Sequence, residues 1–183
     1  TVIASVIPRV GSGDTLLLMF PDFNLQTSPC CLLSEQNSLV HDFCTRQKIG
    51  GTHLKYHVKK QLPILHPSAY SQQEKQEISR ITTELTYTSH SLRPWAEELG
   101  FTGPPFPFDP DRRAHLRAEL DAIYARLYGL NREELKFILD PAATHGPDYP
   151  TETFRGLKKN EEREFGEYRT QRLVLEAWDR MTP

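Results

Sequence analysis

The chain has 183 residues, of which 38% are hydrophobic and 25% charged, and its formal net charge at pH 7 is −2. This composition excludes a disordered tail and predicts a chain that buries a core. No apolar stretch is long enough for a membrane span and none has the pattern of a signal peptide, so no membrane partner is expected. Three irregularly spaced cysteines favour free thiols in a reducing, cytoplasmic setting. Because an apolar run starts at once at Thr1, the chain is interpreted as a piece of a longer protein.

Residues 1–68 are predicted to be a small unit that contains β-structure. Residues 2–7 are rich in β-branched side chains and residues 15–20 are continuously apolar, so both segments are predicted strands. Residues 30–33 are interpreted as a third, short and buried strand. Three strands make too small a sheet to be stable alone, so this unit is expected to be half of a larger β domain.

One helix is predicted inside this first unit. Ser34 is interpreted as its N-cap, and the glycine pair Gly50–Gly51 as its end. The following segment, 55–65, is predicted to be extended because Pro63 and Pro67 disfavour a helix there.

Residues 69–183 are predicted to be a mostly helical region. Helices are expected from residue 71, over 95–99, from 109 to 129, from 131 to 140 and over 161–181. The start signals are an acidic N-cap followed by proline at Asp109–Pro110, and a capping box formed by Asn131 and Glu134. Residues 100–110 and 141–151 are predicted to be irregular loops. The predicted fold class is therefore α+β: a small mixed sheet with one helix, followed by a mostly helical C-terminal region.

A local basic segment stands out against the acidic balance of the whole chain. Residues 41–61 carry five Lys or Arg and one Asp, a net charge of +4, with Tyr56 and three histidines interleaved. Such a mixture is typical of nucleic-acid binding, although a solvated strand–helix edge explains the same charges. Glycines allow a backbone to approach a phosphate closely, and Thr52 and His53 have groups that can bond a base edge. A helix C-cap followed by a strand explains this motif equally well.

No self-sufficient active site is found in the sequence. Asp111, Glu134 and Lys136 fit the spacing of a metal-dependent nuclease, but acidic residues at helix starts explain them without catalysis. The segment Gly103–Phe106 is similar to the (Asp/Asn)-Pro-Pro-(Tyr/Phe) motif of amino-methyltransferases, but glycine has no side chain to accept a bond from the target amine. The preferred interpretation of this segment is a proline-rich loop that Phe101, Phe106 and Phe108 pin against the core. The spacing of His and Cys residues does not indicate a metal site.

A resemblance to a known family is carried by segments spread over most of the chain. They are NSLVHDF at 37–43, RQKIGGTHL at 46–54, QLPI at 61–64, RAELDA at 117–122, LYGL at 127–130, EELKFILD at 133–140, FGEYRT at 165–170 and RLVL at 172–175. These segments resemble the second half of the target recognition domain and the helical tail of large adenine-specific DNA methyltransferases. Such enzymes belong to type II (single-chain) restriction–modification systems and to related phage-defence systems.

The resemblance implies a parent enzyme that methylates adenine N6 in a defined DNA site with S-adenosylmethionine, with or without an attached nuclease. It also implies that residues 1–68 help to read double-stranded DNA and that residues 69–183 form a scaffold. The catalytic residues and the cofactor would belong to an N-terminal methyltransferase domain of the same polypeptide, so none is assigned in this chain. The implied DNA contacts are phosphate contacts from Arg46, Lys48, Lys55 and Lys59, and groove contacts from Gly50, Gly51, Thr52 and His53.

The alternative interpretation is a helical protein–protein interaction module without DNA affinity. It is based on an apolar stripe at helical spacing, formed by Leu116, Leu120, Ile123 and Leu127.

Overall fold

The structure is a computed structural model that describes residues 2–13, 16–20, 29–50, 54–150 and 152–181. Within these ranges every regular element is a helix. The elements are α1 (Pro29–Asn37), α2 (Leu39–Arg46), α3 (Tyr56–Lys59), α4 (Gln72–Thr86), α5 (Arg93–Glu98), α6 (Pro110–Leu127), α7 (Arg132–Leu139), α8 (Pro141–His145), α9 (Arg155–Phe165) and α10 (Arg169–Met181), with short 3-10 turns at Pro67–Ala69 and His90–Leu92. The predicted α+β class with a small mixed sheet is therefore wrong, and the described part of the chain is all-α.

The predicted N-terminal strands are irregular segments in the structure. The backbone N–H groups of Val2 and Ala4 donate to the side chains of Asp42 (2.8 Å) and Asn37 (3.0 Å), and Asn37 Nδ2 donates back to the Ala4 carbonyl (2.9 Å). Leu16 to Phe20, the described part of the second predicted strand, is likewise not a strand. A strand needs a neighbouring strand to complete its hydrogen bonds, and the described residues supply side chains from α1 and α2 instead.

The third predicted strand, 30–33, lies inside α1, and this prediction is wrong because a short apolar run has the same pattern in a buried helix. Ser34 is in the middle of α1, where its hydroxyl donates to the Cys30 carbonyl (2.6 Å). The true N-cap is Ser38, whose side chain accepts from the His41 N–H at the start of α2. Residues 55–65, predicted as extended, contain α3, because Pro63 lies far enough along the chain to leave one helical turn before it.

The C-terminal region is helical as predicted, and its caps confirm the sequence signals. Asp109 caps α6, and Asn131 with Glu134 forms the capping box of α7. Helix α4, predicted to start from residue 71 without an assigned cap, begins with a capping box formed by Ser71 and Glu74. Two details differ. The predicted loop 141–151 contains α8, which Asp140 caps.

The helix predicted over 161–181 is two helices, α9 and α10. Gly166 follows α9 with a φ of 76°, a left-handed conformation that glycine adopts without strain and that ends a helix. Tyr168, just after this turn, is buried and directs the chain into α10.

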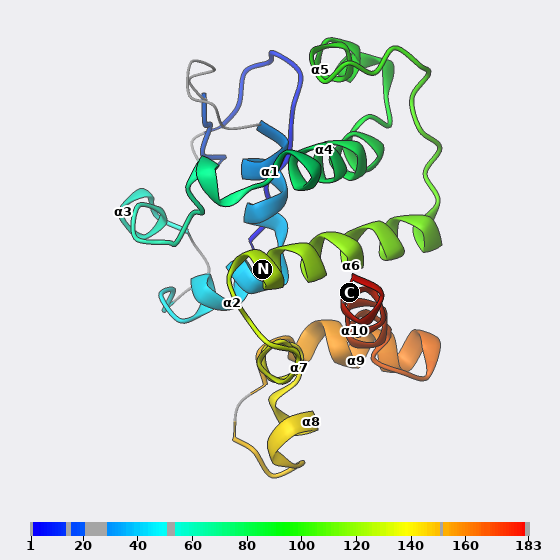
Figure 1. The fold of residues 1–183 in the computed structure, drawn as a ribbon. Coiled ribbons are helices and arrows are strands. Elements are labelled where there is room, and N and C mark those ends of the chain that lie inside the picture. The colour runs from blue at the N-terminus through cyan, green and yellow to red at the C-terminus, as the bar shows by residue number, and fades with distance from the viewer. Residues whose placement is uncertain (1, 14–15, 21–28, 51–53, 151, 182–183) are drawn as a thin grey trace.

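Helix α6 lies across the middle of the molecule, with α1 and α4 on one side and α7, α9 and α10 on the other (Figure 1). One hydrophobic cluster joins α1, α4 and α6, with Cys31, Ile78 and Leu116 at its centre. A second joins α2, α6, α7 and α10, where small side chains such as Ala122 let the helices approach closely. Residues from both sides of residue 68 contribute to each cluster, so α1 and α2 pack as part of the helical assembly.

The apolar stripe of α6 is part of this core. Leu116, Leu120 and Ile123 are buried in the cluster with α1 and α4, and Leu127 packs against it. Other helices of the same chain therefore cover the stripe.

Candidate nucleic-acid interface

The predicted DNA contacts lie after the C-terminal end of α2 and around α3 (Figure 1). Lys48 and Gly50 are exposed after α2, and Lys55 is exposed at the N-cap position of α3. Gly51, Thr52 and His53 lie outside the described residues. Lys60, which belongs to the same basic segment, is also exposed, and its Nζ lies 4.5 Å from the ring centroid of Tyr56.

Arg46 is engaged with the protein itself. Its Nε donates to Asp42 (3.1 Å), its Nη1 donates to the Thr153 carbonyl (3.1 Å), and its guanidinium lies 5.1 Å from the ring centroid of Phe154. It therefore holds the segment before α9 against α2.

Lys59 is also occupied, since its Nζ donates to the Gln36 side chain at 2.7 Å. Burial lowers the pKa of Lys59 below its ordinary value. Of the predicted phosphate-binding cations, Lys48 and Lys55 are exposed, whereas Arg46, although exposed as well, is bonded to Asp42 and to the Thr153 carbonyl.

The segment that carries these lysines is anchored to the helical core on both sides. On the α2 side, the Lys48 N–H donates to the Thr45 carbonyl at 2.9 Å, and Thr45 is buried. On the α3 side, Leu62 is buried, and Pro63 accepts a bond from the Tyr128 hydroxyl at 3.3 Å. The core thus holds both ends of a basic, solvent-facing segment.

His41, one of the interleaved histidines, belongs to the core and not to this surface. Its side chain is 2% exposed, and burial lowers its pKa, with the nearby charge of Lys59 adding to the effect. The ring is therefore neutral at pH 7, and it contributes no charge to a DNA contact.

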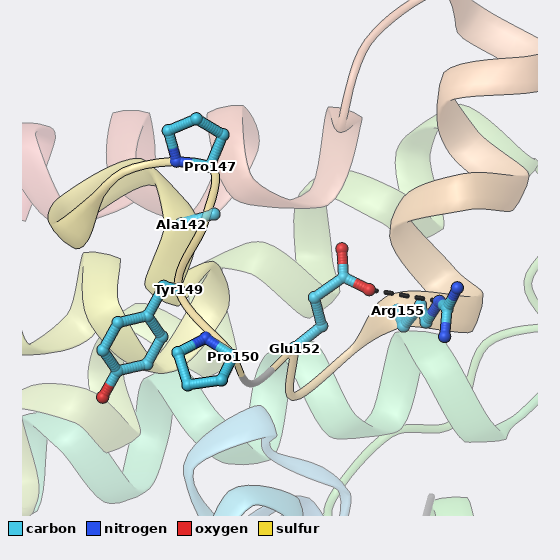
Figure 2. Close-up of a pocket in the computed structure, with 6 residues that line it drawn as sticks. All are labelled: Ala142, Pro147, Tyr149, Pro150, Glu152 and Arg155. Atoms are coloured by element: carbon cyan, nitrogen blue, oxygen red, sulfur yellow. Dashed lines mark ion pairs between the residues drawn. The ribbon is translucent and has the colours of Figure 1, made fainter.

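A groove opens beside Gln47, at the end of α2. One hollow of ≈ 430 Å³ is lined by Phe43, Arg46, Gln47, Phe137, Pro141, Tyr149, Glu152 and Thr153. A second hollow of ≈ 340 Å³ is lined by Ala142, Pro147, Tyr149, Pro150, Glu152 and Arg155 (Figure 2). The two hollows share Tyr149 and Glu152, and together they are called the α2–α8 groove.

The polar and aromatic groups of this groove are held by neighbours. The Tyr149 ring stacks on His145 with centroids 5.0 Å apart, and it meets Phe137 edge-on at 5.9 Å. Glu152 pairs with Arg155 at 3.2 Å, the ion pair drawn in Figure 2. Sequence reasoning missed this groove because its lining comes from positions more than a hundred residues apart, and no motif marks them.

The nuclease constellation does not form. Asp111, at the start of α6, pairs with Arg169 at 2.8 Å, while Glu134 caps α7 by accepting from the Asn131 N–H at 2.8 Å. Asp111 lies at the first turn of α6, whereas Glu134 lies in α7, which follows the opposite end of α6. Among the residues that the structure describes, no group of three or more His, Cys, Asp or Glu side chains is arranged to hold a metal ion.

The loop around Gly103 is packed through Phe101 and Phe106 as predicted, whereas Phe108, also predicted to pin it against the core, is 69% exposed. A Cβ on Gly103 would lie 2.7 Å from Phe101 Cζ, and Phe101 stacks on Phe106 with centroids 4.8 Å apart. The glycine is therefore needed for a close approach of an aromatic ring, not for chemistry.

The chain matches no protein family, no curated protein and no solved structure. Its function is therefore argued from its own residues and surfaces. In the described ranges, none of the helices is both long enough and apolar enough to cross a bilayer.

Proposed function

We propose that this chain is the DNA-recognition and scaffold part of an S-adenosylmethionine-dependent adenine-N6 DNA methyltransferase that acts in the cytoplasm. The methyltransferase domain would lie in another part of the same polypeptide and would bind the cofactor. The observation that supports this proposal is the exposure of Lys48, Lys55 and Lys60 on an anchored segment beside the glycine pair. The resemblance of residues 37–64 to a target recognition domain adds the specific enzyme class.

The three lysines suit contacts to DNA phosphates. Each cation that neutralises a phosphate releases counterions from the duplex, and this release favours binding at low salt. Because the whole chain is acidic, with a net charge of −2, the rest of its surface adds no general attraction to DNA. Binding is therefore expected to depend on this one segment.

The helical remainder fits the role of a scaffold. Both hydrophobic clusters combine α6 with helices from the first part of the chain, so the orientation of α2 depends on α6, α7 and α10. The alternative function, a helical interaction module without DNA affinity, loses the feature that suggested it, because the α6 stripe is buried within the chain.

A salt titration tests this proposal directly. Binding of a fluorescent duplex to the chain, followed by anisotropy between about 50 and 200 mM salt, is expected to weaken with a log–log slope of about −3 for three phosphate contacts. The double variant Lys48→Glu/Lys55→Glu is expected to bind more weakly and to reduce the magnitude of the slope by about 2.

The matched control is Lys159→Glu, which makes the same charge change at an exposed position of α9. It is expected to bind like the unaltered chain. Binding that ignores salt, or an unchanged affinity of the double variant, would contradict the proposal.

A further inference from the structure

We propose that the α2–α8 groove receives an unstacked DNA base whose major-groove edge carries an exocyclic amino group, adenine or cytosine. Tyr149 would stack on the base, and Gln47 and Glu152 would bond its edge. The inference rests on the proposed function, since it places a base contact beside the phosphate contacts of the basic segment.

The size and walls of the groove suit a flat aromatic ligand. The larger hollow measures ≈ 430 Å³, within the usual range for small-molecule sites. Phe43, Phe137 and Pro141 supply apolar walls, with Tyr149 at the junction of the two hollows. The Tyr149 ring is already held by its stack on His145, so little conformational entropy is lost when a base packs against it.

The charges in the groove favour a base over a phosphate. The Arg46 guanidinium is paired with Asp42, and the Arg155 guanidinium is paired with Glu152. A phosphate in the groove would meet the carboxylate of Glu152 without a free guanidinium in compensation, whereas a neutral base would not be repelled.

The polar lining has the groups that read an amino-bearing base. The amide of Gln47 matches the N6 and N7 edge of adenine, and a carboxylate such as Glu152 accepts from the exocyclic amine of cytosine or adenine. Thymine has no exocyclic amine, and its major-groove edge offers only the O4 acceptor and a methyl group, so neither the paired Gln47 contact nor an amine bond to Glu152 would form there.

The position of the groove connects it to the proposed phosphate contacts. Gln47 lines the groove and immediately precedes the exposed Lys48, so their Cα atoms are about 3.8 Å apart. A nucleotide whose phosphate contacts Lys48 therefore has its base within reach of the groove.

The test compares duplexes that differ only in one bulged position. Anisotropy at constant salt measures the affinity of the chain for a duplex with a bulged adenine, a bulged thymine or a bulged abasic site. The adenine bulge is expected to bind about tenfold more tightly than the abasic bulge, since stacking on an aromatic side chain has about this effect. The thymine bulge is expected to bind less tightly than the adenine bulge.

Variants assign the preference to the groove. Tyr149→Ala is expected to remove the tenfold preference and to leave the salt slope unchanged, whereas Tyr149→Phe retains the ring and the preference. Gln47→Ala, at an exposed position, is expected to reduce the preference for adenine over thymine, and it provides a second test if Tyr149→Ala does not fold. The control is Phe108→Ala, which removes another exposed ring beside an arginine, 4.8 Å from Arg113, just before α6.

The outcomes separate this inference from the proposed function. Salt-dependent binding with equal affinity for adenine and abasic bulges would overturn the groove as a base site and leave the phosphate contacts standing. A preference that survives in both Tyr149→Ala and Gln47→Ala would also overturn it. An absence of salt-dependent binding to any duplex would overturn both proposals.

Discussion

The Tyr128 hydroxyl, at the end of α6, donates a hydrogen bond of 2.7 Å to the carboxylate of Glu35, in α1. The same carboxylate accepts from the Leu65 N–H at 2.8 Å and from the Tyr70 hydroxyl at 3.1 Å. Glu35 is 1% exposed, and burial raises its pKa while the three donors oppose that shift. One buried carboxylate thus joins α1, α6 and the segment that leads from the basic surface to α4.

Loss of this carboxylate is expected to destabilise the fold strongly. Glu35→Ala removes the acceptor of the Leu65 N–H and the Tyr70 hydroxyl and leaves the Tyr128 hydroxyl only its longer bond to Pro63, which predicts a loss of roughly 3 to 5 kcal/mol in the free energy of unfolding. Glu35→Gln is expected to lose less because the amide oxygen still accepts. Urea denaturation followed by circular dichroism measures both, with Glu98→Ala, at an exposed position of α5, as the control. A Glu35→Ala variant as stable as the control would contradict this role.

Asp121 is expected to make stability decrease as pH rises. Burial, with a smaller contribution from the charge of Asp42, raises the pKa of Asp121 from 3.8 to about 7, although the Leu39 N–H and Arg117 oppose this shift. Between pH 3.8 and about pH 7, Asp121 is protonated in the folded chain and ionised in the unfolded chain. Folding stability is therefore lost progressively between about pH 4 and 7, by at most about 4 kcal/mol. Above that range Asp121 causes no further change in folding stability.

The variant Asp121→Asn isolates this effect. Its amide oxygen can still accept from the Leu39 N–H, and it cannot ionise. Relative to the unaltered chain, its free energy of unfolding is expected to rise as pH increases from about 4 to 7, measured by urea denaturation at each pH. Asp148→Asn, at an exposed position, should show no such trend. A constant difference between Asp121→Asn and the unaltered chain across this range would exclude a protonated Asp121.

Arg46 and Lys48 are expected to separate stability from DNA binding. Arg46→Ala removes the partner of Asp42, whose side chain is 4% exposed, and releases the contacts to Thr153 and Phe154. The expected loss in the free energy of unfolding is about 2 kcal/mol, less than for a fully buried pair because Arg46 is partly exposed. Lys48→Ala should leave the unfolding curve unchanged, weaken DNA binding and reduce the magnitude of its salt slope by about 1. Equal stability of the two variants would contradict the structural role of Arg46.

Gly103 is expected to be intolerant of any side chain. A Cβ at this position would lie 2.7 Å from Phe101 Cζ, so Gly103→Ala forces the stacked Phe101 and Phe106 rings to move. The predicted cost is about 1 to 3 kcal/mol, measured as a lower midpoint of thermal unfolding. Gly156→Ala, in α9 with open space around it, should instead stabilise the chain by up to about 1 kcal/mol. An unchanged midpoint for Gly103→Ala would show that the ring contact is not required.

The parts of the fold that local chemistry specifies are the parts that sequence reasoning found. Asp109 and Asn131 cap their helices as predicted, because a capping bond needs only residues within three positions of each other. The strands were predicted wrongly because extended structure depends on a partner that local sequence does not reveal. The residues at 30–33 illustrate the ambiguity, since their apolar run packs as a helix against α4.

The candidate interface shows the same division. Charge patterning located the basic segment, and the structure left Lys48 and Lys55 exposed, but it joined Arg46 to Asp42 and Lys59 to Gln36. Gln36, the partner of Lys59, and Thr153, a second partner of Arg46, are distant along the chain, and charge patterning does not reveal such neighbours. The α2–α8 groove was not predicted from the sequence for the same reason.

By itself, the sequence determined the helix caps of the C-terminal region, the packed loop at Gly103 and the place of the basic segment, since these depend on interactions between residues close along the chain. Only the tertiary structure decided the all-α class of the described residues, the burial of the α6 stripe and the groove beside Gln47. These features arise where α6 brings together segments far apart in the sequence, and hydrophobic burial depends on which faces meet rather than on the order of residues.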